Sequence, residues 1–421
     1  MARPFMQVQE PQTPPPTPAV LRHWQRLLLG DGVAVSRPIV WIIGFFAFLN
    51  VYSMQSVLPM VMQDFHASPV QAGATVGATV LAIALVSPFM GMLSDALGRK
   101  VIICTSLFAL TLPTALIPLA GSLQAIVVLR FLQGLAVPGI VVVLIAYLSE
   151  EFSAGGVARM TATYVGGTVM GGFCGRFITG HAGQVLGWRG AFFTLAVMNL
   201  LGALLVLRHL PASRQFVAHR NVRGAFQTLG RHLSNRRFLA ICAVGFCVLF
   251  SLVGSFTYVN LHLAGVPFNL STAGLANVFG VYLVGVVVTP MAARHVVRHG
   301  FLKAVQFSLA FSAAGLLLTL LPSLVAVIVG LAVCSTGVFI CQSSTISHIA
   351  DNVTEGRSLA TGIYYLSYYA GGAAGTWVAG LAYEGWSWSG SVLAIIAFQG
   401  LAGLIAFVFL KPVPKPLAPA Q

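Results

Sequence analysis

Long apolar stretches alternate with short polar segments along almost the whole chain. A bilayer core is about 30 Å thick, so a helix that spans it needs roughly 20 mostly apolar residues. The stretches have this length, and we therefore predict spanning helices, within a few residues, at 39–62, 71–92, 101–121, 124–148, 161–182, 190–207, 238–261, 272–293, 302–321, 324–347, 359–383 and 390–410.

Composition supports a membrane protein. Hydrophobic residues make up 57% of the 421 residues and charged residues only 8%, with a mean hydropathy of +0.88. Soluble domains carry about 25% charged residues, so this chain has too few charges to cover a soluble surface.

The net charge of +14 indicates topology and not a nucleic-acid partner, because 20 of the 23 cations lie in the tails and in alternate loops. Only Arg189 falls in a loop on the other side, and Arg130 and Arg176 fall inside spans. Positive charges collect on the cytoplasmic side, so both termini are expected to be cytoplasmic.

The two halves of the chain resemble each other. Pro88 and Gly98 correspond to Pro290 and Gly300, and the run GGFCGRFITG from 171 corresponds to GGAAGTWVAG from 371. Small residues let helices pack closely; the expected packing glycines are Gly171, Gly172, Gly175, Gly371, Gly372 and Gly375. Two pseudo-symmetric bundles with a site between them are typical of transporters.

This repeat divides the chain into five parts. We predict a disordered, basic cytoplasmic tail at 1–38, a six-helix bundle at 39–207, a basic cytoplasmic linker at 208–237, a second six-helix bundle at 238–410 and a cytoplasmic tail at 411–421.

No residue pattern predicts catalysis or a bound cofactor. All six cysteines lie within predicted spans without the CxxC spacing of zinc sites, so we expect neither disulfides nor a metal. No GxxxxGK[ST] loop for nucleotide phosphates is present, and no catalytic constellation is apparent. We therefore expect a protein that is not an enzyme and has no cofactor.

The loop after the second span carries a motif with recognisable spacing, GMLSDALGRK. It resembles the G-x-L-x-D-x-x-G-R-[RK] motif of the major facilitator superfamily, which implies an all-α membrane fold of twelve helices in two six-helix bundles. In that family the motif latches the inner gate in the outward-open state. The matching residues are Gly91, Leu93, Asp95, Gly98, Arg99 and Lys100.

Two further elements resemble motifs of the superfamily, and the second of them is the antiporter motif of efflux-type members. LRFLQG in the fourth span resembles the family's R-x-x-Q-G element, at Arg130, Gln133 and Gly134. The glycine-rich run at 166–180 resembles the antiporter motif but lacks its Gly-Pro step. Over roughly residues 39–410 the chain resembles drug:proton antiporters and arabinose-efflux-permease-like proteins, in a YnfM-like branch. This implies a multi-pass protein of the bacterial cell inner membrane.

Two arginines within the membrane are candidate solute ligands. A charge in the bilayer core is costly, so it faces the bundle interior and usually serves function. Arg130 and Arg176 lie at similar depths, and we hypothesise that they bind an anionic group of the solute. The alternative is that both only brace helices through backbone carbonyls.

The nine carboxylates all fall outside the middle of the membrane. Proton-coupled relatives commonly place a carboxylate in the first span, where this chain has Asn50. Protons, if they are coupled, would be carried by Asp64 at the outer end of the first span, by His348, or by the solute.

Other polar side chains are candidates for lining the cavity. Tyr364 and Tyr368 are spaced to share a helix face, and Gln342 and His348 lie on a polar part of the tenth span. Gln55, with Asn50, is the candidate from the first half. For these residues helix packing is an equally good explanation.

The sequence therefore predicts a monomeric secondary transporter in the lipid bilayer, with a small-molecule substrate and possible proton coupling. The leading hypothesis is proton-linked export of a drug-like or sugar-like compound. The alternatives are an importer or uniporter of an organic anion and, from another class, a passive channel.

Overall fold

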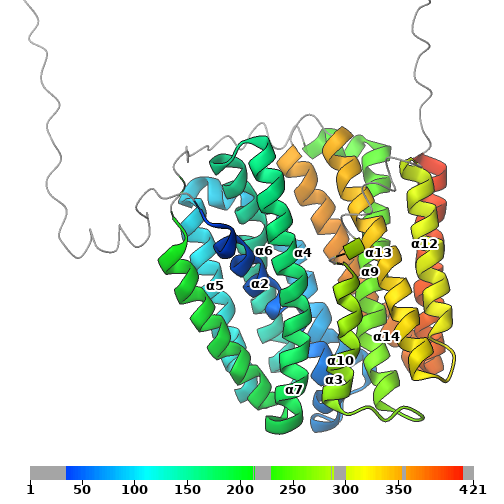
Figure 1. The fold of residues 1–421 in the computed structure, drawn as a ribbon. Helices are drawn as coiled ribbons and strands as arrows, with labels where there is room; N and C mark the ends of the chain where they lie inside the picture. The colour runs from blue at the N-terminus through cyan, green and yellow to red at the C-terminus, as the bar shows by residue number, and fades with distance from the viewer. Residues whose placement is uncertain are drawn as a thin grey trace, which may run out of the picture.

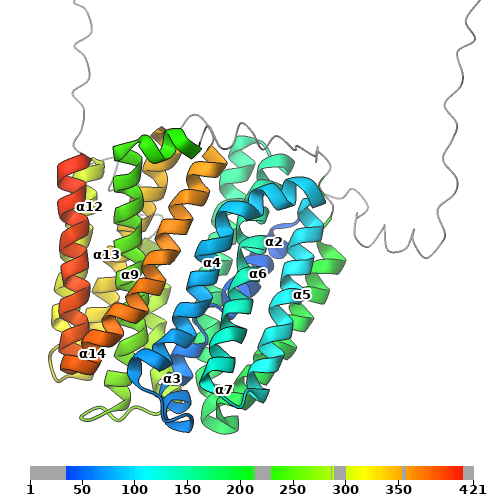
Figure 2. The ribbon, with the colours of Figure 1, turned by 180° about the vertical axis from the view of Figure 1, so that it is seen from behind.

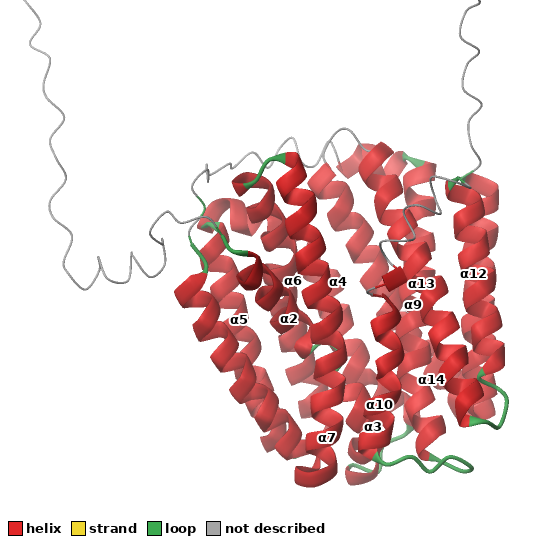
Figure 3. Ribbon diagram, viewed as in Figure 1, coloured by secondary structure: helices red, strands yellow, loops and turns green. Residues whose placement is uncertain are grey.

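The computed structural model describes residues 35–211, 213, 229–285, 287–288, 300–352 and 357–410. Their regular secondary structure is entirely helical (Figure 3). In lipid a backbone must satisfy its own hydrogen bonds, and a helix does so within one segment. The helices are α2 (Arg37–Leu49), α3 (Met54–Asp64), α4 (Pro69–Leu97), α5 (Arg99–Leu116), η1 (Ile117–Leu119), α6 (Leu123–Glu151), α7 (Ala154–His209), α9 (Arg236–Ala264), α10 (Thr272–Val278), η2 (Phe279–Leu283), α12 (Phe301–Leu318), α13 (Leu324–Asn352) and α14 (Arg357–Phe409).

The helices form two bundles that stand side by side, α2–α7 and α9–α14 (Figures 1 and 2). The start of α2 and the end of α14 lie toward the same end of the molecule. The predicted linker and tails lie largely outside the described residues, so the domain boundaries stay predictions.

Two long helices are in fact hairpins. α7 turns at Gly187, whose φ of 71° suits glycine, and α14 turns at Trp386 and Ser387. Both turns fall between predicted spans. With the limbs counted separately and α10 taken as the start of the eighth span, the described residues contain the twelve spans expected. The end of the eighth predicted span lies outside the described residues.

The first predicted span is not one continuous helix, which corrects the expectation for 39–62. α2 ends at Leu49, α3 begins at Met54, and four residues between them form turns. The amides of Val51, Ser53 and Gln55 bond to carbonyls three residues earlier, so the regular pattern of the α-helix is interrupted.

The internal repeat is visible in the backbone. Gly98 between α4 and α5 has φ of 95°, and its counterpart Gly300 before α12 has φ of 81°. Both turns require the left-handed region that glycine reaches without strain.

Glycines of α7 pack directly on α2. A Cβ at Gly171 would overlap the carbonyl oxygen of Phe45, and one at Gly175 would overlap that of Leu49. Only glycine lets the two backbones approach this closely.

The second bundle repeats this contact between α14 and α9. A Cβ at Gly371 would overlap the carbonyl oxygen of Phe246, and one at Gly375 would overlap that of Phe250. Gly372 faces Val80 of α4, at 2.9 Å from its ideal Cβ, so the same glycine run also contacts the first bundle.

The bundles touch closely along α4 and α14. A side chain at Gly73 would collide with the hydroxyl of Tyr258, and one at Gly77 with the hydroxyl of Thr376. At the end of this contact that the charge distribution predicts to be the outer one, the Val70 amide donates to Glu384 Oε1 at 3.1 Å. The two halves are therefore in contact on this side of the molecule.

Candidate functional site

Arg176 lies where the two bundles meet. It is 1% exposed, and its guanidinium carbon lies 4.6, 4.8 and 4.4 Å from the ring centroids of Tyr52, Phe279 and Tyr282. Its Nε donates to Gln55 Oε1 at 2.7 Å and its Nη1 to the carbonyl of Gly172 at 2.8 Å. Rings facing a cation stabilise it through their negative faces. No salt bridge joins Arg176 to a carboxylate in the part of the chain that the structure describes.

Gln55 links this arginine to the second bundle. Its Nε2 donates to Thr257 Oγ1 of α9 at 2.9 Å, while its Oε1 accepts from Arg176. All three side chains are buried. One amide thus joins the Arg176 group to α9.

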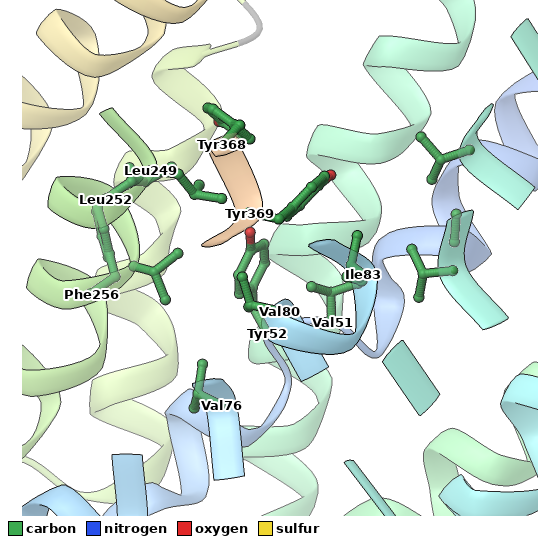
Figure 4. Packing of buried hydrophobic residues seen from close by; sticks show 14 of the residues in the cluster. Val51, Tyr52, Val76, Val80, Ile83, Leu249, Leu252, Phe256, Tyr368 and Tyr369 are labelled. Carbon is green, nitrogen blue, oxygen red and sulfur yellow. The ribbon is translucent and has the colours of Figure 1, made fainter. Parts of the chain in front are cut away.

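Tyrosines of α14 lie beside this centre. Figure 4 shows Tyr369 next to Tyr52, with Tyr368 on the other side of the α14 backbone. The rings of Tyr364 and Tyr368 stack with centroids 5.8 Å apart. Tyr364 is fixed by a 2.9 Å hydrogen bond to Thr345 of α13. The expected pair, Tyr364 and Tyr368, therefore packs together on α14, and Tyr368 also contacts the ring of Tyr369.

Arg130 occupies a different place, inside the first bundle. Its Nη1 and Nη2 donate to the carbonyls of Asn50 and Val51 at 2.8 and 2.6 Å, and its Nε donates to the Thr75 carbonyl at 3.0 Å. Nη1 also donates to Gln133 Oε1 at 2.7 Å. These contacts match the bracing alternative, and they hold the break between α2 and α3.

Asn50 also points into the first bundle. Its Nδ2 donates to Asn199 Oδ1 at 2.8 Å, and Gln133 donates to Thr114 Oγ1 at 2.7 Å. Both side chains are fully buried. Asn50 and Gln133 therefore help to hold the helix break. They lie inside the first bundle and not at the contact between bundles.

The loop motif forms an ion network at the inner end of α4. Arg99 Nη2 lies 2.5 Å from Asp95 Oδ1 and 2.6 Å from Glu150 Oε1 of α6. Arg99 also donates to Ser94, and Ser213 donates to Glu150 Oε2 at 3.0 Å. Glu150 was not among the predicted members. The signal in the sequence that could have identified it was a carboxylate at the end of the fourth predicted span.

The remaining motif residues surround this network. Gly98 forms the turn between α4 and α5, and Lys100 is buried. The Gly91 carbonyl accepts a hydrogen bond from Ser94 at 2.9 Å, and Leu93 is 42% exposed.

Three other candidates are placed away from the Arg176 centre. Asp64 Oδ2 accepts from Arg189 at 2.7 Å and from Trp188 at 3.0 Å at the outer end of the first bundle. His348 stacks on Phe301, with ring centroids 4.0 Å apart. Gln342 is half-buried on α13, and its carbonyl accepts from the hydroxyl of Thr345.

Sequence reasoning missed the aromatic partners of Arg176. Tyr52 lies in an unpredicted break, and Phe279 and Tyr282 lie in η2. The only signal in the sequence for these partners was the presence of two aromatic residues in the eighth predicted span, together with an arginine inside the membrane. Within the described residues no group of three or more His, Cys, Asp or Glu could hold a metal ion.

The model of the Major Facilitator Superfamily matches residues 40–356, which is more than half of the chain. The chain belongs to the Major Facilitator Superfamily. Superfamily members are membrane transporters, so this protein is a multi-pass secondary transporter of small solutes.

Relatives within the superfamily cover most of the chain. The inner membrane transport protein YnfM of Escherichia coli is 30% identical over 363 residues, 86% of this chain and 87% of that protein. The MFS-type transporter YybF of Bacillus subtilis is 29% identical over 362 residues, 86% of this chain and 89% of that protein. The YnfM-like resemblance is confirmed at this level.

Solved structures confirm the superfamily fold. A bacterial homologue of the human lysosomal transporter Spinster, inward-facing and unoccupied, has a TM-score of 0.73 at 15% identity, covering 90% of this chain and 98% of that chain. The nucleoside transporter NupG has a TM-score of 0.70 at 12% identity, covering 89% and 100%.

Proposed function

We propose that this superfamily member exports a small organic, drug-like or sugar-like solute that carries an anionic group, and that Arg176 binds that group. The observation that best supports this proposal is the position of Arg176. Its side chain is buried between the bundles, among aromatic rings, without a carboxylate partner in the described chain.

The physical argument is that a negatively charged solute group would compensate the buried positive charge of Arg176. A buried charge without a counter-ion is destabilising, and rings facing it offset only part of that cost. A carboxylate or phosphate of a solute would supply the missing counter-charge through charge-assisted hydrogen bonds. The rings of Tyr52 and Tyr282 would then contact the apolar part of the same solute.

The position also suits alternating access. Tyr52 and Gln55 belong to the first bundle and Tyr282 and Thr257 to the second. A solute bound here contacts both halves, so its binding can bias their relative position.

Export and proton coupling are the less directly supported parts of the proposal. Both follow the resemblance to efflux-type members, and the chloramphenicol resistance protein CraA of Acinetobacter baumannii is 24% identical over 188 residues, 45% of this chain. Proton carriage is proposed for Asp64, His348 or the solute itself. Uptake into inside-out and right-side-out vesicles separates export from import or uniport of an organic anion.

The test begins with a ligand-stabilisation screen of the purified full-length protein. A solute at 100 times its Kd stabilises the folded state by about 2.7 kcal/mol, which raises the melting temperature. We expect small organic acids among the stabilising compounds and loss of their effect in Arg176→Gln. The control is Arg189→Gln, which removes a cation that is half-exposed at the outer end.

Arg176→Lys refines the test, because it keeps the charge and removes the planar fork. We expect weakened but detectable binding in this variant. A cationic cognate solute, or unchanged affinity in folded Arg176→Gln, contradicts the proposal.

A further inference from the structure

An apolar groove of about 380 Å³ lies on the second bundle, away from the Arg176 centre. Figure 2 shows α9 between the two limbs of α14, and the groove follows this arrangement. Residues of all three helical segments line it, among them Cys242 and Phe246 of α9 and Ile363, Ser367, Phe398 and Leu401 of α14.

The groove accepts only an apolar occupant. Its one hydroxyl, on Ser367, donates to the carbonyl of Cys242 at 2.9 Å and is therefore already satisfied. At its margin Leu239 is 39% and Leu401 is 45% exposed. In a membrane such a surface faces acyl chains and not water.

The depth of the groove fits one leaflet. From Leu239 to Cys247 it follows α9 for eight residues, about 12 Å of helix rise. Half of a bilayer core is about 15 Å thick. The groove thus extends from one membrane surface to near the middle.

The end of the groove that reaches the membrane surface is basic. Arg236 is the first residue of α9 and is exposed, and it lies three residues before Leu239 and therefore on the same face of the helix. Neither the first turn of α9 nor Asn235 before it contains a carboxylate. Cations at this position attract anionic headgroups, by about 1 kcal/mol for each residue.

We propose that this groove binds an acyl chain of an anionic phospholipid, with the lipid phosphate held by Arg236. In the predicted orientation the lipid belongs to the inner leaflet. The bound chain covers α9 and both limbs of α14 at once, so the lipid stabilises the packing of three elements of the second bundle.

The experiment uses purified full-length protein in mixed micelles with equal amounts of phosphatidylglycerol and phosphatidylcholine. Native mass spectrometry then measures the retained lipid. We expect preferential retention of phosphatidylglycerol, and a decrease of that preference by about fivefold in Arg236→Gln. Arg208→Gln, also exposed but on α7, is the control and should keep the preference.

A second variant tests the groove itself. Ala243→Trp places a ring among the lining residues and should abolish retention of both lipids, whereas Leu204→Trp on the 48% exposed surface of α7 should not. Equal retention of the two lipids by the wild type would overturn the proposal. So would an equal loss in Arg208→Gln, which would indicate only nonspecific attraction to a basic protein.

Discussion

At the scale of single residues, Arg130 determines how the first span is built. At the break between α2 and α3 the Asn50 carbonyl accepts from Ser53 three residues later, and Arg130 donates to the carbonyls of both Asn50 and Val51. The break in turn places Tyr52 and Gln55 beside Arg176. Arg130 is therefore a positioning residue for the centre between the bundles.

We predict that Arg130→Leu lowers the free energy of unfolding by about 3 kcal/mol, since the Val51 carbonyl and the Gln133 Oε1 lose their donor and a buried acceptor without a donor costs about 1–3 kcal/mol. Thermal unfolding of the purified protein measures this change. Arg208→Leu, which alters an exposed arginine at the end of α7, should change stability by less than about 0.5 kcal/mol. A loss of stability in Arg130→Leu no larger than that in Arg208→Leu would show that the hydrogen bonds of Arg130 contribute little.

Asp95 is the next residue to test. Its carboxylate shares Arg99 with Glu150, so we propose that it sets the strength of the inner-end network. We predict that Asp95→Asn reduces transport severalfold in vesicles while the protein stays folded and inserted. Arg159→Gln, at an exposed position, serves as the control. Unchanged turnover in Asp95→Asn would show that Asp95 contributes only to the membrane topology of the chain.

The sequence showed which residues are important better than it showed what those residues contact. An arginine inside a membrane span is conspicuous in sequence, and both arginines are at structurally central places. Whether such a side chain faces carbonyls or rings depends on the backbone around it. Asn50 could not be placed because it lies in the break, and Tyr52 was missed for the same reason.

At the scale of elements, apolar length predicted most of the helices. The turns at Gly187 and Ser387 fall where polar and aromatic residues interrupt the apolar runs. The break in the first span also falls among polar residues, Asn50, Ser53 and Gln55, but the apolar run resumes after them within the length of a single span. The break depends on donors from Arg130 of another helix, so apolar periodicity could not reveal it.

The contact of α4 with α14 allows an element-scale prediction. Gly77→Val adds a branched side chain where even a Cβ would collide with Thr376 Oγ1, so closure of the two helices becomes unfavourable. We predict more labelling by a membrane-impermeant maleimide of a cysteine introduced at Val70, which lies at the outer end of this contact. Gly121→Val has open space around it and should leave labelling unchanged. Equal labelling in both variants would contradict the role of this contact in closure.

At the scale of the whole molecule, the hydrogen bonds between bundles run from the Gln55–Thr257 contact to the outer end. His181 and Asn277 are 3.0 Å apart across α7 and α10, and the Ala273 amide donates to Gln184 Oε1 at 3.4 Å. These contacts close the molecule on one side. Alternating access requires them to open while the Arg176 centre remains in place.

The most direct test of this account is a reversible cross-link across that outer contact. A Cβ at Gly183 would lie 3.7 Å from Cγ2 of Thr272, so cysteines at the two positions would bring their sulfur atoms within reach of each other. In Gly183→Cys/Thr272→Cys, solute exchange by the protein in proteoliposomes is measured before and after reduction. The account predicts no exchange in the oxidised protein, wild-type exchange after reduction, and no effect of oxidation on either single-cysteine variant. Exchange at the wild-type rate by fully cross-linked protein would contradict it.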